Sequence, residues 1–198
     1  SKEADEHRFT PHATGKISRL TAIDPTIIST SLIRERLGEA LPAARLYETL
    51  EESAITLGST FRWIQAIWWG DGEALARMQQ PETLIGAVSY QRLSGLIDAC
   101  FQLAMATTLD QIQQETMIPF AIKSFRFYRP ADDTQELWGY AQQVGPRKWN
   151  IQLLNTMGEV LAEIAGFEMR VVSSETFRGA EAWQEWLYTV EWQPQPRF

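Results

Sequence analysis

The chain has 198 residues and a formal net charge of −7, so it lacks the basic balance that favours nucleic-acid binding. Its content of 44% apolar and 11% aromatic residues is ample for a packed core and argues against a disordered chain. One cysteine excludes an internal disulfide and a cysteine-based metal site, and no apolar run approaches the roughly 20 residues that span a bilayer. We expect one domain with an arm at each end, cytoplasmic, and cut from a longer polypeptide at Ser1.

The first part of the chain predicts an extended arm followed by two helices. The arm covers 8–22, and a short helix from Ser31, as its cap, to Leu37 is ended by Gly38. Pro42 suits the first turn of a second helix, whose apolar stripe continues to 57–58. We treat these residues, 1–58, as an arm and helical lead-in to the main domain.

A change to alternating periodicity then predicts a β-hairpin. Strands over 61–69 and 73–80 flank Gly70-Asp71-Gly72, which is a strong turn signal. Trp68 and Trp69 are adjacent in the first strand, so one ring faces inward, and we expect the other to contact another domain or subunit.

The rest of the chain predicts one long helix and an antiparallel sheet. A loop over 81–90 leads into an apolar helix over 94–108, and the predicted strands are 120–128, 136–144, 148–155 and 159–172. This pattern fits the α+β class, and the economical packing wraps the sheet around the helix, which is the hotdog fold. We assign 59–175 to this domain and the Trp-rich segment 176–198 to a linker.

Asp98 and Gln102 are the candidate functional residues of the predicted helix. Their spacing of i and i+4 places both side chains on one face. A carboxylate and a carboxamide in an apolar setting need either a satisfied structural role or a chemical one. The structural alternative is that Asp98 caps free amides in the first turn and Gln102 is a polar core residue. The apolar neighbours are Leu96, Ile97, Cys100, Phe101, Leu103 and Ala104.

Several short segments each match a known family only weakly, but their common order and spacing make the match specific. They are HATG at 12–15, LGSTFR at 57–62 with DGEAL at 71–75, the helix start at 90–102, IPF at 118–120 with GEV at 158–160 and FEMR at 167–170, and WLYTVEW at 186–192. Together they resemble the C-terminal hotdog half, with its flanks, of the dehydratase domain of modular polyketide synthases. In that family HA(S/T)G, YGPxFR … DGEAL and YxxHPxLLDAxxQ are usual.

The resemblance implies that two hotdog units each supply one catalytic residue. A histidine from the N-terminal hotdog takes the α-proton of a β-hydroxyacyl thioester, and an aspartate on the C-terminal helix protonates the leaving hydroxyl. By position, Asp98 matches that acid and Gln102 matches the residue that orients it. The implied partners are a flanking ketoreductase or methyltransferase region and an acyl carrier protein. The sequence has no glycine-rich phosphate loop and no metal-ligand cluster, so we expect no cofactor and no metal.

The chain departs from the family pattern around the implied active site. The family base lies in an HxxxGxxxxP motif, and neither His7 nor His12 has that spacing. The HP before the helix is here Leu93-Ser94, and the Tyr and Pro of YGPxFR are Leu57 and Ser59. We therefore expect a non-catalytic structural domain, a pseudo-dehydratase, that pairs with a second hotdog as a homodimer. The alternatives are the C-terminal half of an active dehydratase and a stand-alone hotdog thioesterase.

Overall fold

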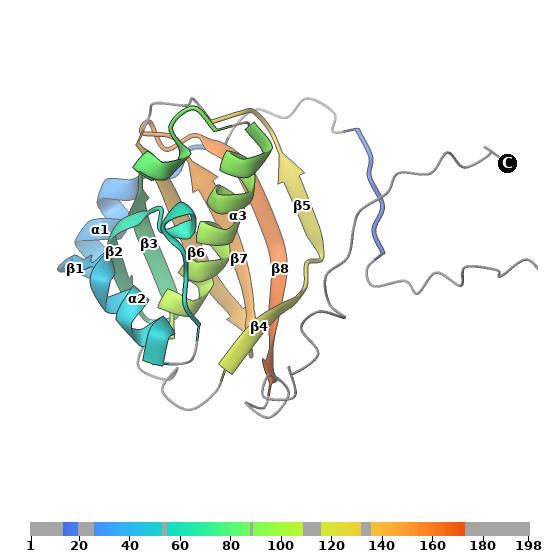
Figure 1. The fold of residues 1–198 in the computed structure, drawn as a ribbon. Helices are drawn as coiled ribbons and strands as arrows, with labels where there is room; N and C mark the ends of the chain where they lie inside the picture. The colour runs from blue at the N-terminus through green and yellow to red at the C-terminus, as the bar shows by residue number, and fades with distance from the viewer. Residues whose placement is uncertain are drawn as a thin grey trace, which may run out of the picture.

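The structure is a computed structural model that describes residues 14–19, 26–52, 55–87, 89–108, 116–131 and 136–172. In the described residues a long helix, α3 (Ser89–Ala106), lies in the hollow of a curved antiparallel sheet, as Figure 1 shows. The sheet order is β1-β2-β3-β6-β7-β8-β4, and β5 also pairs with β8. The strands are β1 (Leu41–Pro42), β2 (Ile64–Gly70), β3 (Glu73–Met78), β4 (Thr116–Ala121), β5 (Ser124–Phe127), β6 (Leu137–Gly145), β7 (Lys148–Leu154) and β8 (Val160–Val172).

Two short helices precede the hairpin. The first, α1 (Thr30–Leu37), begins after Ser29, whose hydroxyl accepts a hydrogen bond from the amide of Leu32. The predicted cap, Ser31, was wrong because Ser31 already lies inside the first turn. The second helix, α2 (Ala43–Glu52), ends earlier than predicted, and the 3₁₀ turns η1 (Ser59–Phe61) and η2 (Glu82–Leu84) precede β2 and α3.

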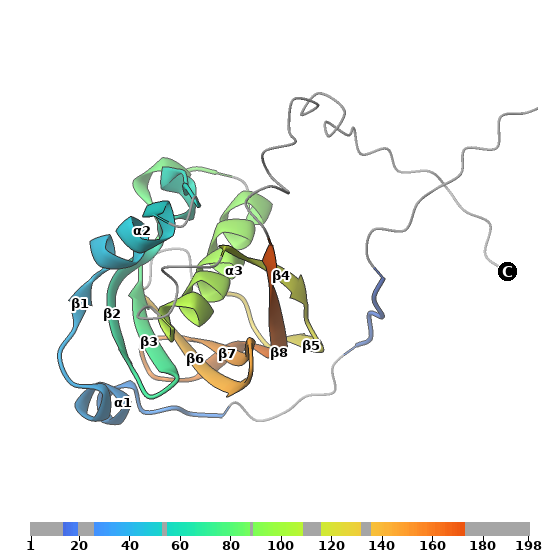
Figure 2. The same cartoon turned by 90° about the horizontal axis from the view of Figure 1, so that it is seen from below.

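The sheet is apolar on both faces, and each face is covered by a different helix. Its concave face packs against α3 to form the main core, whereas α1 covers a second cluster on the outer face (Figure 2). Trp69 packs against the main core, and Trp68 lies in the outer cluster with the guanidinium of Arg34 at 5.0 Å from its ring. The outward ring therefore contacts α1 of the same chain, which corrects our expectation of another domain or subunit.

The hairpin and the later strands lie close to their predicted positions. Gly70 pairs with Glu73 across the predicted turn, and the predicted strand 159–172 is β8 (Val160–Val172). The single strand predicted over 120–128 was wrong: the chain forms β4 (Thr116–Ala121), which starts earlier, and then β5 (Ser124–Phe127), and both pair with β8. No described helix combines the length and the apolarity that crossing a bilayer demands.

Candidate functional site

The side chains of Asp98 and Gln102 project together from the middle of α3. Gln102 Nε2 donates one hydrogen bond to Asp98 Oδ2 at 2.7 Å and another to the backbone oxygen of Phe61 at 3.0 Å. Gln102 is 5% exposed and Asp98 is half-buried. The i, i+4 spacing thus produces the shared face that the sequence predicts, and the carbonyl of Phe61 in η1 adds a third member.

The orientation of the Gln102 amide follows from its partners. Both neighbours are acceptors, so Nε2 must face them, and the reversed amide would place Oε1 against two oxygens. Among the described residues, no donor reaches the buried Oε1. A buried acceptor without a donor costs about 1–3 kcal/mol, and such groups are typical of sites where function rather than stability accounts for the residue.

The environment of Asp98 favours its protonated form. Burial raises the pKa of the Asp98 carboxyl above its ordinary value of 3.8, and the hydrogen bond from Gln102 lowers it only in part. The helix-cap alternative is wrong, because α3 begins at Ser89 and Asp98 lies beyond the free amides of the first turn. We expected a loop over 81–90 and therefore did not predict that α3 begins as early as Ser89.

Gly95 allows η1 to approach α3 closely enough for the Phe61–Gln102 hydrogen bond. A Cβ atom at Gly95 would lie 2.7 Å from Trp63 Nε1 and 2.9 Å from the backbone oxygen of Thr60. Trp63 Nε1 in turn donates to that same oxygen at 3.2 Å. Only a residue without a side chain fits between the helix and this turn.

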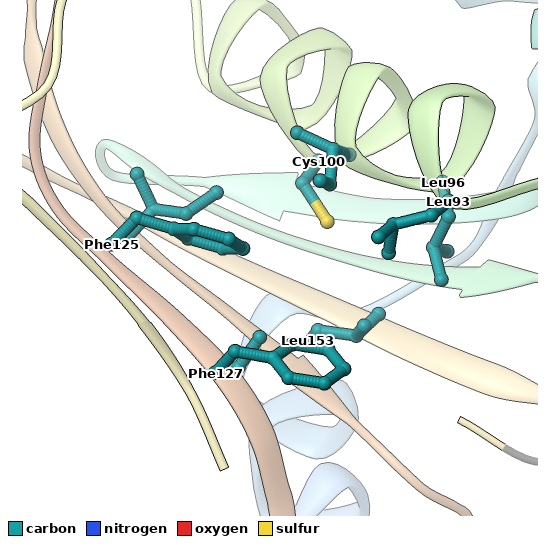
Figure 3. A pocket seen from close by; sticks show the side chains of 9 residues that line it. Leu93, Leu96, Cys100, Phe125, Phe127 and Leu153 are labelled. Atoms are coloured by element: carbon teal, nitrogen blue, oxygen red, sulfur yellow. The ribbon is translucent and has the colours of Figure 1, made fainter. Parts of the chain in front are cut away.

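An apolar pocket lies on a different face of α3 from the acid. Neither Asp98 nor Gln102 lines it, and Figure 3 shows the sulfur of Cys100 pointing into it between Phe125 and Leu93. The phenylalanines of β5 are partly exposed, with 45% of Phe125 and 44% of Phe127 accessible. The full lining is Leu93, Leu96, Ile97, Cys100, Phe125, Phe127, Leu153, Ala162 and Ile164.

Some residues considered in the sequence analysis lie outside the described part of the chain. They are the two histidines that lack the spacing of the family base motif, His7 and His12, and the linker segment 186–192. Within the described residues, no group of three or more metal-ligating side chains could hold an ion. Sequence reasoning missed the Phe61 carbonyl, because a backbone acceptor has no residue-type signal. A glycine inside an apolar helix, Gly95, was the available sign of a close approach.

The sequence and the fold agree with one protein family. Residues 28–178 match the profile described as the polyketide synthase dehydratase N-terminal domain. The chain belongs to the polyketide synthase dehydratase family. The structure is similar to the dehydratase domain from the CurJ module of the curacin polyketide synthase, with 33% identity, a TM-score of 0.66, and coverage of 76% of this chain and 56% of that one. An inactive CurJ dehydratase mutant in complex with Compound 21 gives 31% identity, a TM-score of 0.69, and coverage of 79% and 57%.

The relatives of this dehydratase-family chain are much longer proteins. Polyketide synthase PksL of Bacillus subtilis (strain 168) is 25% identical over 170 residues, which are 79% of this chain and 4% of PksL. The chain also spans little more than half of the solved CurJ dehydratase chains. These likenesses confirm the predicted α+β hotdog fold and the family. The profile names the N-terminal domain, whereas our motif comparison predicts the C-terminal half.

Replacing Gly95 with alanine should test the close approach. Alanine favours a helix interior by about 1 kcal/mol, but the forced shift of Trp63 and the Thr60 carbonyl costs about 1–3 kcal/mol. We expect a net loss of stability in urea unfolding. Gly70→Ala is the control, because its new Cβ would lie 3.8 Å from Leu37 Cδ2, an ordinary contact. A Gly95→Ala variant as stable as the wild type would contradict the packing described.

Replacing Asp98 with asparagine should change how stability depends on pH. The folded-state pKa of Asp98 is raised, so its contribution to stability is fully present below the unfolded value of 3.8 and is lost as the pH rises through the folded value. The wild type should therefore lose stability relative to Asp98→Asn across that interval. Urea unfolding of both proteins at a series of pH values measures the difference, and parallel pH profiles would refute it.

Proposed function

We propose that the chain is the acid-bearing hotdog of a polyketide synthase dehydratase, in which Asp98 protonates the hydroxyl that leaves a β-hydroxyacyl thioester. The observation that carries the proposal is the Asp98–Gln102–Phe61 chain of hydrogen bonds at 2.7 and 3.0 Å. It fixes a carboxyl whose pKa burial has raised, which is the combination that a general acid needs.

The proposal also gives the two carboxyl oxygens different roles. Because Gln102 donates to Oδ2, the acidic proton belongs on Oδ1 of Asp98. In the elimination, a base takes the α-proton, the electron pair becomes the new carbon–carbon double bond, and the β-carbon–oxygen bond breaks. The Oδ1 proton joins the leaving hydroxyl to give water. The base then releases the α-proton to solvent and Asp98 takes one up, so both groups return to their starting states. The products are an enoyl thioester and water.

The proposal places this chain in the C-terminal half of the dehydratase. The family's acid is carried on the helix of that half, and Asp98 occupies the matching position on α3, although the matched profile is described as the N-terminal domain. The histidine base would come from a second hotdog, since His7 and His12 do not have the spacing of the family motif. The solved CurJ dehydratase chains are long enough to include such a second unit.

The exposed edge of the sheet supports pairing with a second hotdog. The strands β4 and β5 form this edge among the described residues. Three large apolar side chains of these strands and one of the link between them are 42–51% exposed: Phe120, Phe125 and Phe127, and Ile122. Burial of such a row is a favourable driving force for association. We propose that the partner hotdog is either the preceding half of the dehydratase or a second copy of this chain, a homodimer.

The same proposal defines the domain bounds of this chain and the synthase domains next to it. We place residues 59–175 as the hotdog, 1–58 as its lead-in and 176–198 as a linker, within a cytoplasmic synthase. A ketoreductase or methyltransferase region would adjoin the unit, and an acyl carrier protein would deliver the thioester. The great length of PksL relative to the matched segment supports flanking synthase domains.

A second candidate function is a non-catalytic structural domain of such a synthase. The observation that favours it is that several positions of the family motifs carry other residues. Leu93, which stands where the family has the His of its HP pair, is 41% exposed and lines the apolar pocket. Leu57, shortly before η1, and Ser59, its first residue, replace the Tyr and Pro of the family motif.

Turnover by the parent synthase polypeptide decides between the two functions. A β-hydroxyacyl thioester on its carrier protein should lose one water, detected by mass spectrometry, and Asp98→Asn should reduce the rate by about 10²- to 10⁴-fold. Circular dichroism of the variant serves as the folding control. Absence of enoyl product in the wild-type polypeptide would favour the structural domain, and undiminished turnover by Asp98→Asn would remove the acid from Asp98.

A further inference from the structure

The turn that carries the Phe61 carbonyl is held by α2. Helix α2 (Ala43–Glu52) packs Leu46, Tyr47 and Leu50 into the main core. The hydroxyl oxygen of Tyr47 accepts a hydrogen bond from the amide of Ile64 at 3.2 Å. Ile64 is the first residue of β2, so this bond fixes the point at which the turn becomes strand. Tyr47 is 8% exposed and Ile64 is 2% exposed.

Arg62, which follows η1 directly, links the turn to α2 and to the Leu57 carbonyl before it. Its Nε donates to the backbone oxygen of Leu57 at 3.0 Å, and its Nη2 donates to Glu51 at 2.8 Å. The guanidinium also lies 5.2 Å from the centre of the Tyr47 ring. The segment is therefore bonded to α2 at two points just after Phe61, namely Arg62 and Ile64, and the Arg62 side chain also holds the Leu57 carbonyl that precedes η1.

We propose that Tyr47 is a positioning residue for Asp98, acting through the turn that presents the Phe61 carbonyl to Gln102. This inference rests on the proposed function, in which Asp98 is the acid. The path has three contacts: Tyr47 Oη to the amide of Ile64 at 3.2 Å, the Phe61 oxygen to Gln102 Nε2 at 3.0 Å, and Gln102 Nε2 to Asp98 Oδ2 at 2.7 Å. Gly95 keeps the turn against α3 and leaves no room for it to shift inward.

The charges around this path keep the Tyr47 hydroxyl neutral. The pKa of Tyr47 is raised to about 12, chiefly by burial and in smaller part by the charge of Asp98, whereas the hydrogen bond from Ile64 and the charge of Arg62 lower it. Of the described titratable groups, Tyr47 on α2 and Cys100 on α3 both have pKa values raised in part by the Asp98 charge. Tyr47 and Asp98 are thus close enough to interact electrostatically, although neither bonds to the other in the contacts described here.

The test is a ¹³C NMR titration of the Asp98 carboxyl in the wild type and in Tyr47→Phe. Removing the hydroxyl frees the Ile64 amide and loosens the turn, so Gln102 should hold the Asp98 carboxylate less firmly. Because that hydrogen bond lowers the pKa of Asp98, its loss should shift the titration midpoint upward. Tyr140→Phe is the matched control, since Tyr140 is a buried tyrosine of the outer cluster whose hydroxyl accepts from Arg36.

An unchanged Asp98 midpoint in folded Tyr47→Phe would overturn the proposal, as would an equal shift in Tyr140→Phe. Should Tyr47→Phe fail to fold, Arg62→Lys provides the second variant: it keeps the charge but loses the Nε hydrogen bond to Leu57, and it should also shift the midpoint upward. The titration needs no turnover. Its outcome therefore separates the positioning role of Tyr47 from any failure of the parent polypeptide to eliminate water.

Discussion

The close approach of α3 to the turn η1 is the constraint on which the candidate site depends. Gly95 leaves room for the Thr60 carbonyl and the Trp63 indole, and this distance lets the Gln102 amide reach the carbonyl of Phe61. The same amide then holds Asp98 Oδ2. A carboxyl on a helix surface would otherwise rotate freely among its staggered positions. Here one backbone carbonyl and one amide fix it, so the orientation of the acid is set by packing rather than by charge.

The site contributes less to the stability of the fold than an apolar core would, so the stability comes from the packing elsewhere. Burial of the charged form of Asp98 is unfavourable for folding, and so is the buried Oε1 of Gln102, which no donor reaches among the residues that the structure describes. Other contacts in and just after α3 show the opposite balance: the Phe101 and Phe167 rings stack at 4.5 Å, and the Trp149 indole donates to the Thr107 hydroxyl at 2.7 Å. These contacts anchor the helix that presents the acid.

The sequence predicted most of the architecture, because periodicity and turn residues are local signals. Gly70-Asp71-Gly72 located the hairpin, and the spacing of Asp98 and Gln102 located their common face. What it missed depends on contacts between distant segments. The carbonyl of Phe61 and the hydroxyl of Tyr47 reach their partners only after α2, η1 and α3 have packed together. The family resemblance gave Asp98 and Gln102 a chemical interpretation that composition alone did not supply.

Hydrogen exchange at the side-chain amide of Gln102, followed by NMR, tests the central claim most directly. If both Nε2 hydrogens are bonded to Asp98 and Phe61 in a side chain that is 5% exposed, they should exchange far more slowly than those of the exposed Gln65. Exchange of the Gln102 amide at the rate of Gln65 would mean that Gln102 does not bridge the turn to the acid, and the account of the site would fail.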